Sequence, residues 1–155
     1  MTGFSHVDDT GAARMVDVTG KDVTVRTAVA AGRVDLSADC VALLRGEGVP
    51  KGDVLAVARV AGIMGAKRTP DLVPLCHPLA LQGITVDLEV DDRGVAVTAT
   101  VRTTDRTGVE MEALTAVTVA CLTVVDMTKA VDPRGVIGDV RVLSKTGGKS
   151  GSWER

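Results

Sequence analysis

The stretch ITVDLEVDDRGVAVTATV, residues 84–101, decides the fold class of this chain. Apolar residues occupy every second position on both sides of its centre DDRG (91–94): Ile84, Val86, Leu88 and Val90 before it, and Val95, Val97, Ala99 and Val101 after it. Alternation with a period of two is typical of a strand with one buried face, and a polar tetrapeptide ending in glycine is typical of a turn. The stretch therefore predicts a β-hairpin.

Two further segments extend the predicted sheet. Residues 23–36 form an extended stretch in which Val23, Val25 and Val29 lie on one face. Residues 136–143 (VIGDVRVL) have the β-branched content of a last strand. With the hairpin, these segments predict about four strands.

Shorter helices are predicted around the sheet. Ser37 is a plausible N-cap for a helix over residues 38–45, and Asp53 for a helix over residues 54–67. Residues 68–78 cannot form a regular helix because they contain three prolines, Pro70, Pro74 and Pro78. These elements predict an α+β fold, an antiparallel sheet of about four strands with helices packed on one face.

The longest predicted element is a helix over residues 107–131. Its first residues, TGVE, fit a capping box in which Glu110 is the partner of Thr107. Its many valines and threonines also suit a strand, but its length favours a helix. Apolar residues occur nearly all round it, so it must be buried on most sides. A single chain of 155 residues has few residues with which to bury such a helix on all sides. The helix therefore predicts contacts between subunits.

Two charged residues near the end of this helix are candidates for chemistry. Asp126 and Lys129 are three residues apart, within side-chain reach. They form either an ordinary solvated salt bridge or a desolvated acid–base pair. Glu112 lies fourteen residues before Asp126, within about 40° on the helix but about 21 Å away along its axis. If both carboxylates serve one site, they should come from different subunits.

The composition narrows the class of protein. The net charge is −2 and the chain has only two aromatic residues, Phe4 and Trp153, so nucleic acid is not expected as a partner. The uncharged run of residues 113–125 is shorter than the roughly 20 apolar residues that span a membrane, so no membrane partner is expected either. Three cysteines without metal-finger spacing suit a reducing cytoplasm.

The length suits one domain over residues 1–155. The first twenty residues are polar and contain glycine, which predicts an irregular arm over 1–20. Residues 145–155 are rich in glycine and serine, which predicts a flexible tail.

Several loop residues are further candidates. Lys51 precedes a helix N-terminus, a place that suits anions, although a lone loop lysine is often only solvated. His77 is held beside Pro78, which suits either a ligand-binding or a structural histidine. Cys76 invites thiol or metal chemistry, which is not favoured because no other histidine lies nearby in sequence.

The C-terminal string KTGGKSG (145–151) is similar to a phosphate-binding P-loop, but its glycine spacing fails and too little chain follows for the helix. Two interpretations of this string remain: a glycine loop in which Lys145 and Lys149 bind phosphate, or a disordered tail.

Long strings of the sequence resemble the MoaC family. The chain contains, in this order, MVDVTGK (15–21), KGDVLAVARVAGIMGAKRTPDL (51–72), PLCHP (74–78), GVEMEALTA (108–116), DMTKAV (126–131) and VIGDVRVLSKTGGKSG (136–151). The resemblance runs from about His6 to Gly151.

The resemblance implies a reaction, a fold and an assembly. Members of the family act in molybdenum cofactor biosynthesis on a 3′,8-cyclised dihydroguanosine triphosphate made from GTP. They convert it to cyclic pyranopterin monophosphate and release diphosphate. The resemblance also implies a ferredoxin-like fold and a homohexamer built as a trimer of dimers, with sites at subunit interfaces.

The matching motifs carry the family's site residues onto this chain. They imply a catalytic role for Asp126, Lys129 and Lys51. They imply substrate contacts for Leu75, Cys76, His77, Glu110, Met111 and Glu112, and phosphate contacts for Arg26, Lys145 and Lys149. Arg106 departs from the family, which has lysine before Thr-Gly, and the hydrogen-bond geometry of that position differs accordingly.

As a mechanism, Asp126, Lys129 and Lys51 would exchange protons, while the lysines, His77 and Arg26 would stabilise phosphoryl charge. No protein-held metal and no cofactor is expected. A non-catalytic module that binds a small ligand is the alternative, since a fold alone does not determine function.

Overall fold

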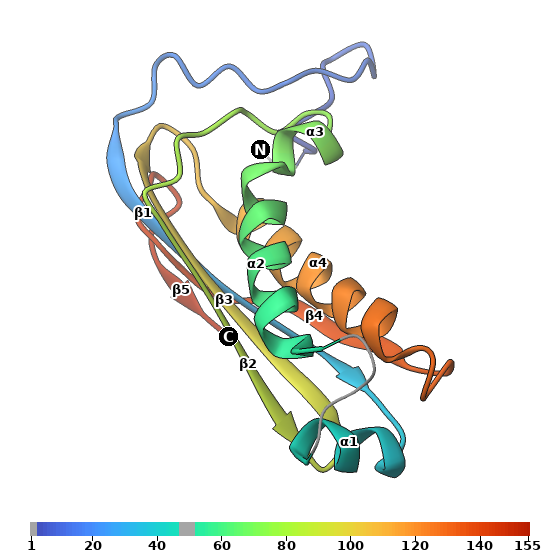
Figure 1. Cartoon of the computed structure of the whole chain (residues 1–155). Helices are drawn as coiled ribbons and strands as arrows, with labels where there is room; N and C mark the ends of the chain where they lie inside the picture. The colour runs from blue at the N-terminus through green and yellow to red at the C-terminus, as the bar shows by residue number, and fades with distance from the viewer. Residues whose placement is uncertain (1–2, 47–51) are drawn as a thin grey trace.

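The computed structural model describes residues 3–46 and 52–155 and contains a five-stranded sheet with helices on one face (Figure 1). The strands lie in the order β2-β3-β1-β4-β5, and all neighbours are antiparallel. The elements are β1 (Thr24–Asp35), α1 (Ala38–Arg45), α2 (Val54–Lys67), α3 (Thr69–Leu72), β2 (Gly83–Asp91), β3 (Gly94–Asp105), α4 (Glu110–Thr128), β4 (Val136–Thr146) and β5 (Trp153–Glu154). This arrangement confirms the predicted α+β, ferredoxin-like fold, with one short strand added at an edge.

The predicted hairpin is β2 and β3. Val86 pairs with Ala99 and Leu88 with Val97, and Asp91 and Gly94 close the turn. The Asp91 carboxylate accepts the backbone N–H groups of Arg93 and Gly94, at 2.9 and 3.0 Å. The turn therefore closes through its own aspartate, as its sequence predicts.

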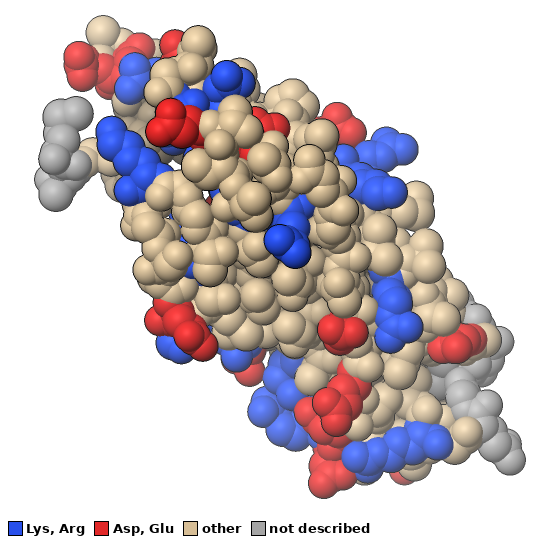
Figure 2. Space-filling view, turned by 90° about the vertical axis from the view of Figure 1, so that its left-hand side faces the viewer, with Lys and Arg blue, Asp and Glu red and all other residues tan. Residues whose placement is uncertain are grey.

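The middle of the central strand β1 turns small residues toward the helices, while Arg26 and Val34 are buried nearer its ends. Ala28, Ala30 and Val34 are buried, whereas Val23 and Val25 are about half exposed. The predicted common face of the valines is thus the open face of the sheet, largely uncharged in the middle of Figure 2. Alanine is needed on the inner side because α4 crosses β1 there.

The capping predictions hold for two helices and fail for the third. The side chain of Ser37 accepts the N–H of Cys40 at the start of α1, and that of Asp53 accepts the N–H of Ala56 at the start of α2. No side chain caps α4, which begins after Val109. The predicted capping box is therefore wrong, because an ion pair with Lys145 holds the Glu110 carboxylate instead.

Helix α4 supplies much of the core. Its buried residues include Ala113, Ala116, Val117, Ala120, Cys121 and Val124. It contacts α2 on one side and β1, β3 and β4 on another. By length and composition α4 could cross a membrane, but half of its apolar window is buried inside the protein, as in the core helix of a soluble protein.

Residues 68–78 contain one short helix, α3, with Pro70 in its first turn, where proline is tolerated. The rest of this segment is irregular, as its prolines predict.

The N-terminal arm contacts the segment after α3, and the C-terminus pairs at the edge of the sheet. Residues 3–23 are irregular except for a bridge between Val7 and Ala13. The C-terminal segment differs from the flexible tail predicted for 145–155, because β4 continues to Thr146 and β5 pairs with it. Gly147, Gly148 and Gly151 have positive φ angles, which permit the reversal between the two strands.

The contact of α2 with α4 depends on Gly62. A Cβ atom there would lie 2.9 Å from the Ala116 carbonyl oxygen and 3.2 Å from the Ala120 Cβ. Gly62→Ala should lower the free energy of unfolding by about 1–3 kcal/mol through overpacking. Gly138→Ala, at a position with nothing within 4 Å, is the control in urea titrations. Stabilisation by Gly62→Ala, the usual effect in an exposed helix, would contradict this packing.

Candidate active site

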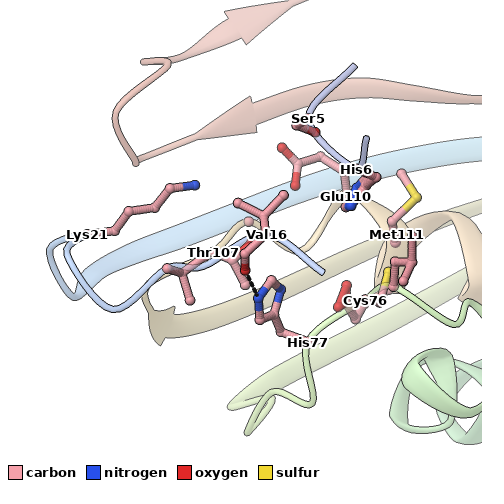
Figure 3. A pocket seen from close by; sticks show the side chains of 13 residues that line it. Ser5, His6, Val16, Lys21, Cys76, His77, Thr107, Glu110 and Met111 are labelled. Atoms are coloured by element: carbon pink, nitrogen blue, oxygen red, sulfur yellow. Dashed lines mark hydrogen bonds between the residues drawn. The ribbon is translucent and has the colours of Figure 1, made fainter. Parts of the chain in front are cut away.

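A cavity of about 220 Å³ lies where the arm, the segment after α3 and the start of α4 meet (Figure 3). The structure brings together here the predicted substrate residues of two motifs: Leu75, Cys76 and His77 from one, and Glu110, Met111 and Glu112 from the other. The arm adds residues that sequence reasoning missed: Ser5, His6, Val16, Val18 and Lys21. Lys21 belongs to the string MVDVTGK, which resembles the family, but its residue type and spacing alone do not indicate a place in the site.

Glu112 is the most unusual group of the cavity. It is only 3% exposed, and its Oε2 has no hydrogen-bond partner among the residues that the structure describes. Burial, and to a smaller extent the nearby charge of Glu110, raise the pKa of this carboxyl to about 7. Glu112 can therefore hold or release a proton near neutral pH, which is what acid–base chemistry needs.

His77 and Cys76 lie beside it. The ring Nε2 of His77 is 2.6 Å from the backbone carbonyl oxygen of Val16, so the arm contacts the cavity directly. Burial, and then the charge of Glu112, raise the pKa of the Cys76 thiol. A raised pKa disfavours the nucleophilic thiolate, in agreement with the low expectation for thiol chemistry.

Glu110 connects the cavity to the glycine loop. Its Oε1 lies 2.6 Å from Nζ of Lys145, and both side chains are mostly buried. The same ammonium group donates to Oγ of Ser150 at 3.1 Å. Lys145, predicted to contact phosphate, thus holds the loop 147–151 against α4 and lines neither this cavity nor the next.

A second cavity, of about 430 Å³, is basic. Its lining includes Arg26 and Lys149, both predicted to meet phosphate, together with Lys21, Thr24 and Gly148. The buried Arg26 donates from Nε to the Asp105 carbonyl oxygen at 2.9 Å. Gly148 has a φ of +85°, and a Cβ atom there would overlap Nη1 of Arg26. Lys21 lines both cavities, so the two hollows adjoin at this residue.

Asp126 and Lys129 lie apart from both cavities. They form an ion pair of 2.5 Å near the end of α4, and each side chain is more than half exposed. The interpretation as a desolvated pair is therefore wrong for the described part of a single chain, in which both side chains remain more than half exposed. Helix α4 is continuous over Glu112 and Asp126, so the predicted separation of about 21 Å applies. Lys51 lies outside the described residues.

Arg106, the position at which the family has lysine, lines neither cavity. Among residues 3–46 and 52–155, no group of three His, Cys, Asp or Glu side chains is placed to hold a metal ion.

Comparison with known proteins covers nearly the whole chain. Residues 15–148 match the family model described as the MoaC family. The chain is 72% identical over 152 residues to the cyclic pyranopterin monophosphate synthase of Streptomyces coelicolor, an alignment that covers 98% of this chain and 89% of that protein. It is 70% identical to the protein of that name from a Nocardioides species, with 98% and 95% covered. It is 61% identical to that of Corynebacterium glutamicum, with 99% and 98% covered.

The burial of Glu112 predicts a pH dependence of stability. Because the pKa rises on folding from 4.5 to about 7, the folded state binds more protons than the unfolded state between these values. Stability should therefore fall as pH rises from about 4.5 to 7, by about 3 kcal/mol from this group. Glu112→Gln, which cannot ionise, should remove that part of the dependence.

Urea titrations at pH 5 and pH 8, at one fixed chain concentration, measure this difference. The same pH dependence in the wild type and in Glu112→Gln would show that Glu112 is not desolvated.

Proposed function

This chain belongs to the MoaC family, and we infer from that membership that it is a cyclic pyranopterin monophosphate synthase of molybdenum cofactor biosynthesis. It converts the 3′,8-cyclised dihydroguanosine triphosphate made from GTP to cyclic pyranopterin monophosphate and releases diphosphate. The observation that carries this function is the pair of adjoining cavities. One cavity contains the two glutamates Glu110 and Glu112, and the other contains the cations Arg26 and Lys149; Lys21 lines both. A nucleoside triphosphate likewise has a ring that can donate hydrogen bonds and a chain of anionic phosphates.

The first cavity suits the ring system of the substrate. Glu112 offers a buried carboxyl whose Oε2 has no partner among the described residues, and a guanine-derived ring carries N–H groups that can donate to it. Leaving such a group unpaired costs about 1–3 kcal/mol, so a ligand that donates to it is selected over one that does not.

The second cavity suits the phosphates. Formation of a cyclic phosphate requires a substrate hydroxyl to attack the α-phosphorus while the bond to the β-phosphate oxygen breaks. The hydroxyl proton passes to a base, and negative charge grows on the departing diphosphate. Arg26, Lys21 and Lys149 are cations placed around this hollow, and fixed cations stabilise such developing charge.

Asp126, Lys129 and Lys51 are proposed as catalytic residues supplied to this substrate by a neighbouring chain. The exposed position of Asp126 and Lys129, about 21 Å from Glu112 along α4, supports a site shared between subunits. A second copy that packed against this end of α4 would also desolvate the pair and alter its proton affinity.

The proposed assembly is a homohexamer, a trimer of dimers. It is supported by a large apolar area on the outer side of the helices, where Val57, Val60, Met64, Leu72 and Leu122 are exposed. Met64 and Leu72 line a hollow of about 400 Å³ together with Ala61, Gly65 and Val119, and Arg68 and Asp71 complete its lining. Contiguous exposed apolar surface is typical of interfaces between proteins. The cytoplasm is the proposed compartment, which suits three cysteines that are all free thiols.

The reaction itself is the first test. Purified protein given the cyclised GTP intermediate should release diphosphate and form a pterin that can be oxidised to a fluorescent product. Asp126→Asn should lower kcat by about 10²–10⁴-fold, the range for a positioned acid or base. A well-folded oligomer that forms no product would support the alternative of a non-catalytic binding module, which the synthase relatives do not favour.

Subunit sharing is tested by mixing two inactive variants. Glu112→Ala and Asp126→Ala each remove one half of every site. In oligomers mixed at random from equal amounts, about one quarter of the sites should combine an intact Glu112 with an intact Asp126 of another chain, and activity should return. No recovery, with mixing confirmed by mass spectrometry, would mean that both residues act within one chain or that one is structural.

A further inference from the structure

We propose that a turn in the N-terminal arm, built on Asp17, positions His77 as its Nε2–H tautomer, so that Nδ1 accepts a hydrogen bond from the ring or ribose part of the substrate. The part of this proposal that concerns substrate rests on the proposed function. The part that concerns the tautomer does not.

The tautomer follows from one contact. Nε2 of His77 lies 2.6 Å from the backbone carbonyl oxygen of Val16 (Figure 3). A carbonyl oxygen can only accept, so Nε2 must carry the proton in this contact. A neutral imidazole carries one proton, which leaves Nδ1 as an acceptor. Val16 is the only hydrogen-bond partner of the ring within the part of the chain that the structure describes.

The Val16 carbonyl is held by its neighbour. Residues 14–23 belong to no helix or strand, so no regular hydrogen-bond ladder orients this peptide. Instead, Oδ1 of Asp17 accepts the backbone N–H of Thr19 at 2.9 Å and its hydroxyl at 2.6 Å. This Asx turn orders residues 17–19, which directly follow the Val16 carbonyl in the chain. Asp17 itself is exposed and lines neither cavity, so it acts through Val16 and His77 as a positioning residue.

The proton on Nε2 decides what His77 can bind. Its free nitrogen can accept from an N–H or O–H group, and phosphate oxygens offer only acceptors. The ring also lines the cavity of Glu112 and Cys76, whereas Arg26 and Lys149 line the other one. In this proposal His77 accepts a hydrogen bond from the ring or ribose, in place of the stabilisation of phosphoryl charge expected from the sequence. His77 belongs to the end of the site that recognises the ring and ribose.

Nitrogen NMR reads the tautomer directly. The chain has two histidines, so a spectrum of the full-length protein with ¹⁵N-labelled histidine contains two rings, and a His6→Gln sample identifies the signals of His77. Near neutral pH, long-range ¹H–¹⁵N correlation should show a pyrrole-type Nε2 and a pyridine-type Nδ1 for His77. A protonated Nδ1, either as the other tautomer or in an imidazolium ion, would overturn the proposal.

Two variants test the role of Asp17. Asp17→Ala removes the acceptor of the turn, so the two His77 nitrogens should move toward intermediate shifts as the tautomers exchange. Asp17→Asn keeps an oxygen at the same place and should retain the wild-type spectrum. With the cyclised GTP substrate, kcat/KM should fall on the order of 10-fold in Asp17→Ala, as when an outer orienting group is lost, and Asp17→Asn should restore most of it.

A wild-type spectrum in Asp17→Ala would overturn the positioning role. The spectra need no substrate, so they decide the tautomer even if the protein lacks synthase activity. Conversely, an active synthase whose His77 carries its proton on Nδ1 would refute this inference and leave the function intact.

Discussion

The close packing of α4 against the sheet and α2 is the constraint on which the rest of the structure depends. Small residues make it possible, with alanines on the inner side of β1 and Gly62 against the Ala116 carbonyl. Because the helix is long, continuous and packed against α2 and the sheet, it holds Glu112 and Asp126 far apart. Glu112 is carried into the cavity at one end, while Asp126 is left on the surface at the other. The helix thus combines a desolvated carboxyl at one end with an exposed ion pair at the other, which is the basis of the proposed sharing of the site between chains.

The electrostatic character of the site follows from the same packing. Burial without a full set of partners raises the pKa of Glu112, whereas Glu110, two residues earlier, has a close partner in Lys145. That ion pair replaces a helix cap and fastens the glycine loop that closes over Arg26. The two glutamates therefore differ in their electrostatic surroundings, because within residues 3–46 and 52–155 only Glu110 has a cation at ion-pair distance.

The sequence predicts the local elements well and the tertiary contacts poorly. Alternation in the hairpin and the caps at Ser37 and Asp53 are local signals, and the structure confirms them. The capping box fails because Glu110 finds a stronger partner 35 residues away, which no local pattern reveals. The motifs around His77 and Glu112 were identified by resemblance, and they do meet in one cavity. The sequence does not predict that the arm and Lys21 line the cavity, because this depends on the path of the chain past the site and not on residue type.

The central claim is that one substrate site combines the Glu112 cavity of one chain with Asp126 of another. The most direct measurement is a structure of the assembled protein with an unreactive analogue of the cyclised GTP. We expect the ring system beside Glu112 and His77, the phosphates beside Arg26 and Lys149, and Asp126 and Lys129 of a neighbouring chain against the same ligand. A ligand bound with its phosphates in the Glu112 cavity, or contacted by residues of one chain only, would contradict the claim.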